Sequence, residues 1–226
     1  MYEPLQAVRV WDLPTRTFHW LLALCVLGSV ISAKVGGNAM EWHFRFGYGV
    51  FTLIAFRVLW GLVGGRWSRF SSFIYAPATV LRYLRGRALA HEHLEVGHNP
   101  LGAFSVFGLL VLLAAQVGTG LFADDDISNT GPLIKFVSGA TSSLLTKWHK
   151  NVGQWLIIAL VLLHIAAVLF YLVKKKQNLV RPMLSGDKML SARVPASVDR
   201  LQTRGLALAI GIGCAALVAW LVSLGG

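Results

Sequence analysis

The sequence has little charge and almost no cysteine. Only 14% of its 226 residues are charged, and just 10 of them are acidic. A soluble domain carries about 25% charged residues, so this deficit argues against an ordinary soluble protein. The two cysteines, Cys25 and Cys214, stand apart within apolar stretches, and no Cys-x-x-Cys-His motif occurs. Covalently attached c-type haem is therefore excluded.

Long apolar runs replace the missing charge. Each is close to the ~20 residues that a helix needs to cross ~30 Å of hydrocarbon. They lie at residues 17–33, 44–63, 101–122, 148–173 and 206–224. If this chain were soluble, its few polar residues could not cover five such helices. The sequence therefore predicts an all-α membrane protein with a bundle of four transmembrane helices and a fifth at the C-terminus.

The net charge of +11 is distributed unevenly. The N-terminal segment and the second and fourth connections hold fifteen of the 21 Lys and Arg residues, against five in the first and third connections. Basic residues accumulate on the cytoplasmic side of membrane proteins. This pattern predicts a membrane protein with a cytoplasmic N-terminus and a C-terminus on the opposite side, and it argues against a nucleic-acid partner.

The connections contain further expected elements. Residues 77–95 alternate apolar positions with arginines, which favours an amphipathic helix in the inner headgroup layer over a solvated loop. Residues 133–145 are a candidate second interfacial helix. Residues 177–203 are polar and basic with two prolines, and we expect a loop there.

Four histidines lie in or at the edges of the spans, where an ionisable side chain is costly and marks a functional candidate. The topology places His43 and His149 near the outer surface and His19 near the inner surface. His164 follows His149 by fifteen residues, or about 22 Å of helix, so it matches the depth of His19. Two depth-matched pairs suit two bis-histidine haems. A zinc site would need its ligands at one depth, and a single histidine is more often a hydrogen-bonded core residue.

Helical geometry agrees with this pairing. If residues 149–164 form a regular helix, His149 and His164 differ by only about 60° in direction, so both can face the bundle interior. Small residues four positions after a histidine share its face and leave room for a cofactor. They are Ala23, Gly47 and Gly153.

Three arginines are candidates for pairing with haem propionates, because guanidinium groups bind carboxylates through two parallel donors. Arg57 lies fourteen residues beyond His43, about 21 Å deeper and near the level of the inner haem. Its alternative is an arginine that snorkels to the inner headgroups. Arg16 and Arg45 lie close in sequence to His19 and His43.

Residues 8–175 carry a series of motifs in a specific order. They are Val10-Trp11-Asp12-Leu13-Pro14-Thr15-Arg16 with Phe18-His19-Trp20, Trp42-His43 with Gly47, Phe56-Arg57-Val58-Leu59-Trp60-Gly61, Gly97-His98-Asn99-Pro100-Leu101-Gly102-Ala103, Trp148-His149-Lys150-Asn151, and His164. In these motifs the chain resembles the bacterial cytochrome b561 group and the related b-type cytochrome subunits of nickel–iron hydrogenases. The resemblance implies a core at residues 1–175 that holds two b haems. Residues 176–226 add a loop and the fifth span.

The resemblance also implies electron transfer between the membrane quinone pool and an external redox partner, a c-type cytochrome or a hydrogenase. His98 and Asn99 are the expected quinone contacts near the inner haem, although His98 also suits a plain helix start. Residues 124–126, three aspartates, are either a docking site for a lysine-rich cytochrome c or a solvated turn. His91 and His93 have no assigned role.

Two other functions are open. Some members of the family oxidise superoxide at the outer haem and reduce quinone, but the acidic outer cluster disfavours the gathering of an anion. The other alternative is a haem-containing membrane anchor. The sequence leaves open whether the chain is itself an enzyme or an electron-transfer subunit of a quinone-linked oxidoreductase.

Overall fold

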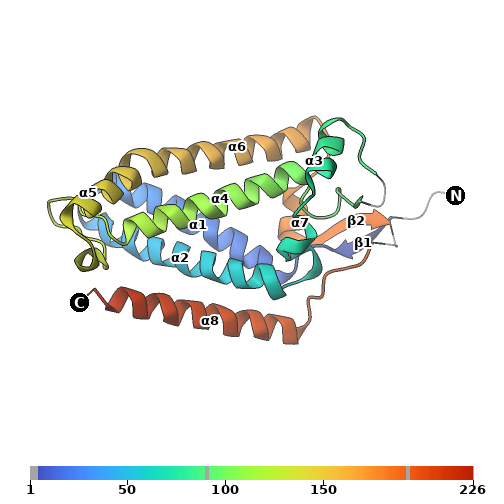
Figure 1. The fold of residues 1–226 in the computed structure, drawn as a ribbon. Helices are drawn as coiled ribbons and strands as arrows, with labels where there is room; N and C mark the ends of the chain where they lie inside the picture. Colours follow the sequence, from blue (N-terminus) through green and yellow to red (C-terminus); the bar gives the residue numbers. More distant parts are fainter. Residues whose placement is uncertain (1–4, 90–91, 192–193, 226) are drawn as a thin grey trace. The chain divides into compact units, whose positions relative to one another are not determined.

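Long helices dominate the computed structural model, which describes residues 5–89, 92–191 and 194–225 (Figure 1). In chain order the elements are β1 (Leu5–Arg9), α1 (Leu13–Val35), α2 (Met40–Val63), α3 (Pro77–Leu84), α4 (Pro100–Gly120), α5 (Gly139–Lys147), a π-helical turn (Trp148–Gly153), α6 (Gln154–Val173), α7 (Val180–Ser185), β2 (Asp187–Ser191) and α8 (Leu201–Ser223). Short 3₁₀ segments lie at Gly37–Ala39, Arg66–Ser68, Phe70–Ser72 and Ile134–Phe136.

Five of these helical segments are long and apolar enough to cross a membrane. They are Leu13–Val35, Gly37–Val63, Pro100–Gly120, Gly139–Val173 and Leu201–Ser223. Many large apolar side chains along them are exposed, among them Leu24, Leu163 and Leu208. Such surfaces are stable in lipid and costly in water. The predicted all-α architecture with five spans is confirmed.

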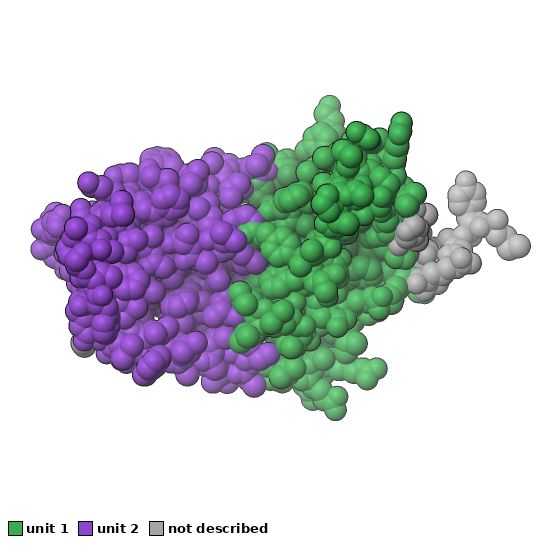
Figure 2. Space-filling view, in the orientation of Figure 1, with its two compact units in different colours: residues 1–17, 57–107, 164–208 green, residues 18–56, 108–163, 209–226 purple. Residues whose placement is uncertain are grey.

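The chain divides into two compact units, shown in different colours in Figure 2, and each long helix contributes residues to both. Unit 2 comprises residues 18–56, 108–163 and 209–226. Its core is Val50 and Ile54 of α2, Leu113 of α4 and Ile157 of α6, with side chains of α1 packed against them. These four helices therefore share one apolar core in unit 2.

Unit 1 comprises residues 1–17, 57–107 and 164–208, and it contains the only sheet among the described residues. Strand β1 pairs antiparallel with β2, with Leu5 opposite Ser191 and Arg9 opposite Asp187. Seven buried apolar side chains pack beside this ribbon: Val8, Val10, Trp11, Trp67, Val96, Leu190 and Val194. The N-terminal segment and the segment before α8 thus share one small core.

A buried carboxylate organises the polar interior of unit 1. The carboxylate of Asp12 accepts hydrogen bonds from the backbone N–H groups of Thr15 and Gly65 at 2.8 and 2.9 Å, and from the Ser68 hydroxyl at 3.0 Å. The Trp60 indole N–H donates to the same carboxylate at 3.3 Å. Since Asp12 is only 1% exposed, these donors replace the water that its charge would otherwise require.

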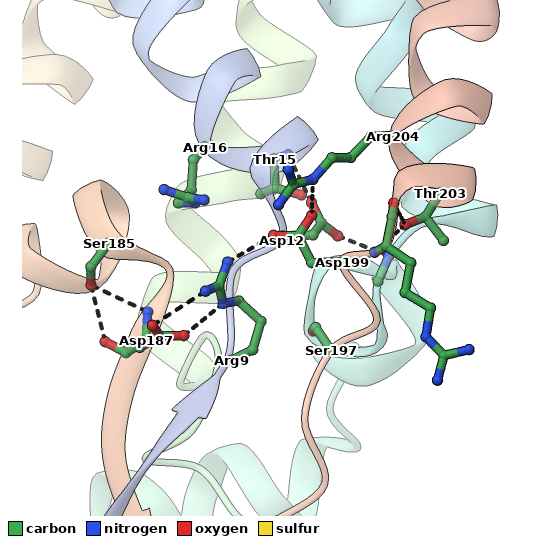
Figure 3. Close-up of polar contacts among 12 residues, drawn as sticks. Arg9, Asp12, Thr15, Arg16, Ser185, Asp187, Ser197, Asp199, Thr203 and Arg204 are labelled. Carbon is green, nitrogen blue, oxygen red and sulfur yellow. Dashed lines mark hydrogen bonds and ion pairs between the residues drawn. The ribbon is translucent and has the colours of Figure 1, made fainter.

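Ion pairs join the N-terminal strand to the start of α8 (Figure 3). The Arg9 guanidinium contacts Asp187 at 2.6 Å and Asp199 at 2.8 Å, and Arg204 contacts Asp199 at 2.8 Å. Hydrogen bonds with Asp187 raise the pKa of Arg9 against the opposing effect of its burial. The fifth helix therefore begins at a segment fixed to the N-terminal strand.

Three predictions for the connections were wrong in part. The helix expected at 77–95 ends at Leu84, because Gly86 turns the backbone into the left-handed region at φ 67°. Leu94, one of the apolar positions of the expected helix, lies buried at 5% exposure. The helix expected at 133–145 is instead α5, which begins after Ser138, whose hydroxyl caps it. The loop expected at 177–203 contains α7 and β2, since a pairing with residues 5–9 leaves no local sequence pattern. The division at residue 175 stays a prediction.

Candidate functional site

Two histidines from different helices face each other in unit 2. His43 lies in the first turn of α2, and His149 lies in the π-helical turn before α6. Their ring centroids are 5.9 Å apart, and the ring planes are nearly perpendicular at 87°. The structure therefore brings together the two histidines that were paired by depth.

Both imidazoles are held by the same kind of contact. His43 Nδ1 lies 2.9 Å from the Ser29 carbonyl oxygen on α1, and His149 Nδ1 lies 2.9 Å from the Gln116 carbonyl oxygen on α4. A carbonyl oxygen can only accept, so each Nδ1 carries the proton and donates it. The Nε2 of each ring is then left with a lone pair for a metal.

The spacing of the rings fits an iron atom between them. Metal–imidazole bonds are about 2 Å long. Two such bonds, together with the distance from each bonded nitrogen to the centre of its ring, place the ring centres roughly 6 Å apart, which the observed 5.9 Å matches. Within the described ranges, no group of three or more His, Cys, Asp or Glu side chains is placed to hold a metal ion.

A large cavity adjoins the histidines. It has a volume of about 1120 Å³, is lined by residues of α1, α2, α4 and α6, and includes His43 and His149. Cofactor sites in proteins span about 300–1,000 Å³, so this cavity is ample. A side chain at Gly47 would enter empty space within it, as the sequence suggested. Imidazoles with free Nε2 atoms beside this cavity fit a haem group.

The π-helical turn corrects one step of the sequence reasoning. The calculated 60° between His149 and His164 assumed a regular α-helix, but residues 148–153 have i→i+5 pairing. Gly153 also does not open space for a cofactor. A Cβ there would lie 1.9 Å from the Gln116 amide oxygen, so this glycine permits close packing. Gly120, which sequence reasoning missed, permits close packing against the His149 ring, since a Cβ at position 120 would lie 2.8 Å from His149 Cε1.

Charged residues at the cavity differ from those expected. Lys34 and Lys150 line it, whereas Arg45 does not. Arg45 pairs instead with Glu41 and lies over the Trp42 ring. The Lys34 ammonium lies 3.2 Å from the Gln154 amide oxygen, and no described carboxylate lies within 4 Å of Lys150. The adjacency of Lys150 to His149 in sequence was the available signal for this residue.

The loop that borders the cavity is ordered by Asp125. Its carboxylate accepts from the backbone N–H groups of Ile127, Ser128 and Asn129 and from the Asn129 side chain. The bonds from Asn129 and Ser128 hold the pKa of Asp125 well below its usual value. Asp124 and Asp125 line the cavity. Docking of a cytochrome c on residues 124–126 stays a prediction.

The predicted inner pair is divided between the units, with His19 in unit 2 and His164 in unit 1. Their pairing stays a prediction. Arg57 does not snorkel: it is 3% exposed, donates to the Ser68 carbonyl oxygen at 3.0 Å and lies over the Phe70 ring at 4.6 Å. Arg16 donates to the Leu184 carbonyl oxygen of α7. Both arginines therefore have contacts within unit 1.

The two expected quinone contacts have different surroundings in unit 1. The His98 ring lies between the rings of Trp11 and Phe73, at 4.7 and 4.6 Å. Asn99 begins α4, since its side-chain oxygen accepts from the Gly102 N–H at 2.8 Å. The helix-start role considered for His98 thus belongs to its neighbour.

Asn99 also joins a short polar chain that sequence reasoning missed. Its amide nitrogen donates to the Tyr171 hydroxyl, which lies 2.8 Å from the Tyr83 hydroxyl. Burial and this contact raise the pKa of Tyr83. Elsewhere, His93 lies 3.9 Å from Glu95, and His91 lies outside the described residues.

The model of the prokaryotic cytochrome b561 family matches residues 10–186, most of the chain. The chain belongs to this family. Its relatives include proteins named probable Ni/Fe-hydrogenase B-type cytochrome subunit from Cupriavidus necator, 27% identical, and Rhodobacter capsulatus, 28% identical. The alignments cover 81% and 82% of this chain and 88% and 85% of those proteins. No solved structure matches. The chain is a multi-pass membrane b-type cytochrome, and the family implies haem b.

Proposed function

We propose that His43 and His149 are the axial ligands of one haem b and that His19 and His164 hold a second. The observation that carries the first assignment is the facing pair of imidazoles, 5.9 Å between centroids, each with its Nδ1 fixed on a backbone carbonyl. The second rests on matched depth along the spans and on the family resemblance.

Residues around the cavity have distinct tasks in this proposal. A bound haem supplies one-electron chemistry between ferric and ferrous iron. Ser29 and Gln116 orient the imidazoles through their carbonyls, while Lys34 and Lys150 offer positive charge for the propionates. Two histidine ligands leave no open coordination position, which favours electron transfer over oxygen chemistry at the iron.

The proposed function is transfer of electrons between membrane quinone and an external redox partner. A hydrogenase is the favoured partner, because the relatives are named as hydrogenase cytochrome subunits. A c-type cytochrome is the alternative, with residues 124–126 as its docking site. In this proposal the quinone binds near His98 and Asn99. The distribution of Lys and Arg supports an inner-membrane location with a cytoplasmic N-terminus and a periplasmic C-terminus.

The test is haem reduction in purified protein reconstituted in lipid vesicles with quinone. We expect reduction of b haem by a quinol, and reduction by H₂ when a nickel–iron hydrogenase is added. His98→Ala and Asn99→Ala are expected to slow the quinol reaction and to leave the H₂ reaction intact. If the protein exchanges electrons with a c-type cytochrome and not with the hydrogenase, the c-type cytochrome is the partner. Exchange with neither quinol nor either protein would contradict the proposed function.

A further inference from the structure

Gln116 contacts His149 at two separate points. Its backbone carbonyl oxygen lies 2.9 Å from His149 Nδ1, and its side-chain Nε2 donates to the His149 carbonyl oxygen at 2.9 Å. Because a carbonyl oxygen only accepts, the amide nitrogen must be the atom that faces it. One residue of α4 therefore holds both the imidazole and the backbone of this histidine.

The backbone that Gln116 holds is the π-helical turn at Trp148–Gly153. Such turns are rare, occur mostly as single turns within α-helices, and are frequent at functional sites. The wider i→i+5 pairing leaves carbonyl groups open to side chains. The Gln116 amide supplies a tertiary partner to the carbonyl of His149 and thereby supports the turn.

Gly153 makes this arrangement possible. A Cβ at this position would lie 1.9 Å from Gln116 Oε1 and 3.1 Å from Trp148 Nε1. The amide therefore packs directly against the bare backbone at the end of the turn. An alanine at position 153 would displace the Gln116 side chain, which is the group nearest to its Cβ.

His43 has no comparable side-chain support of its backbone among the described residues. It lies in regular α-helix, and its Nδ1 contacts the carbonyl and hydroxyl oxygens of Ser29, at 2.9 and 3.1 Å. Among the described residues, no side chain bonds to the His43 carbonyl. The two imidazoles therefore have the same kind of contact, and only the backbone of His149, the histidine in the π-helical turn, has a side-chain partner as well.

We propose that Gln116 is a positioning residue that fixes the orientation of His149 as a haem ligand, with Gly153 as the position that admits its side chain. This inference rests on the proposed function, in which His149 binds haem iron. Groups that orient a ligating histidine tune both the affinity of the site and the potential of the metal. Gln116 is thus expected to set the properties of one haem and not the other.

The test compares Gln116→Met and Gly153→Ala with wild type and with Gly118→Ala. A Cβ at Gly118, also on α4, meets nothing within 4 Å, so this variant is the matched control. Three readouts apply: the ferric haem EPR spectrum, the midpoint potential of each haem, and amide hydrogen exchange at residues 149–154. We expect both test variants to alter one EPR signal and to speed exchange. We also expect about a tenfold change in the ferric-to-ferrous ratio of that haem at fixed potential, about 59 mV for one electron.

The outcomes separate this inference from the function on which it rests. If His149→Ala removes a haem while Gln116→Met and Gly153→Ala leave all three readouts at wild-type values, the role of Gln116 is wrong and the haem assignment stands. If His149→Ala removes no haem, the proposed function fails first. If Gln116→Met binds no haem at all, the role of Gln116 is tested with Gln116→Asn, which keeps an amide but shortens its reach. The same three readouts apply.

Discussion

The two compact units use buried polar groups in opposite ways. In unit 1, the Asp12 carboxylate accepts from four donors that surround it, and the group serves the scaffold. In unit 2, the polar atoms of Ser29 and Gln116 converge on His43 and His149, beside a cavity of about 1120 Å³. A closed polar network stabilises a fold, whereas polar groups arranged around open space prepare a binding site.

Removal of Asp12 is the most severe way to test this contrast. Asp12→Ala leaves several buried donors without an acceptor, each at a cost of ~1–3 kcal/mol. We expect the free energy of unfolding to fall by at least about 3 kcal/mol, measured by denaturant titration in detergent. Thr15→Val, which removes one hydroxyl bond to Ser68, should cost about 1 kcal/mol. Equal stability of Asp12→Ala and wild type would remove the scaffold role.

A methyl group at Gly120 should damage the site of unit 2 and spare the fold. In Gly120→Ala the new Cβ would lie 2.8 Å from His149 Cε1, so the imidazole must move. We expect haem affinity to fall about 10–100-fold, as for the loss of other groups that orient metal ligands. The haem-to-protein ratio after dilution measures this, with Gly118→Ala as the unaffected control. Full retention of haem by Gly120→Ala would contradict the position given to the ring.

The cavity lysines distinguish the structure from the sequence prediction. Lys150→Gln removes a positive charge that lines the cavity, whereas Arg45→Gln removes a charge that does not line it and pairs with Glu41. A charge-assisted hydrogen bond contributes about 1.5–3 kcal/mol, so Lys150→Gln should weaken haem binding about tenfold or more. Haem dissociation rates of the two variants give the comparison. A larger effect of Arg45→Gln than of Lys150→Gln would favour Arg45 as the propionate partner.

Asp125 should give the smallest effect, confined to the loop beside the cavity. Its pKa in the folded protein lies below the ordinary value of 3.8 because the N–H and side chain of Asn129 and the N–H of Ser128 donate to it. Its stabilisation is therefore fully present above pH 3.8 and is lost only as the pH falls through the lowered pKa.

Amide exchange at residues 127–129 measures that stabilisation. We expect no change between pH 5 and pH 8 beyond the intrinsic dependence of exchange on pH, and faster exchange in Asp125→Ala throughout that range. An inflection in the protection of these amides near neutral pH in wild type would contradict the assignment.

Sequence patterns with a local cause predicted the fold well. Apolar runs of about 20 residues defined the five spans, and Gly47 was correctly assigned to open space beside His43. Features made by distant residues escaped prediction. The pairing of β1 with β2 joins residues 5–9 to residues 187–191, and Asp12 gathers donors from residues 60–68, so neither leaves a periodic pattern.

The site was predictable in its residue types and less so in its geometry. The pairing of His43 with His149 was predicted from their matching depths along two helices. The π-helical turn was not foreseen, because the contacts made by its backbone include the amide of Gln116 on another helix. Arg45 was proposed for its closeness to His43 in sequence, and its role toward a propionate stays a prediction, although positions i and i+2 of a helix do not share a face.

The most direct test of the account is the haem content of His43→Ala and His149→Ala, measured by reduced-minus-oxidised spectra and haem-to-protein ratio beside wild type and His93→Ala. His93 lies outside the site and serves as the control. We expect two haems in wild type and in His93→Ala, and the loss of the same haem, by potential and EPR signal, in both test variants. Loss of different haems in the two variants, or loss of none, would contradict the assignment of both facing histidines to one iron.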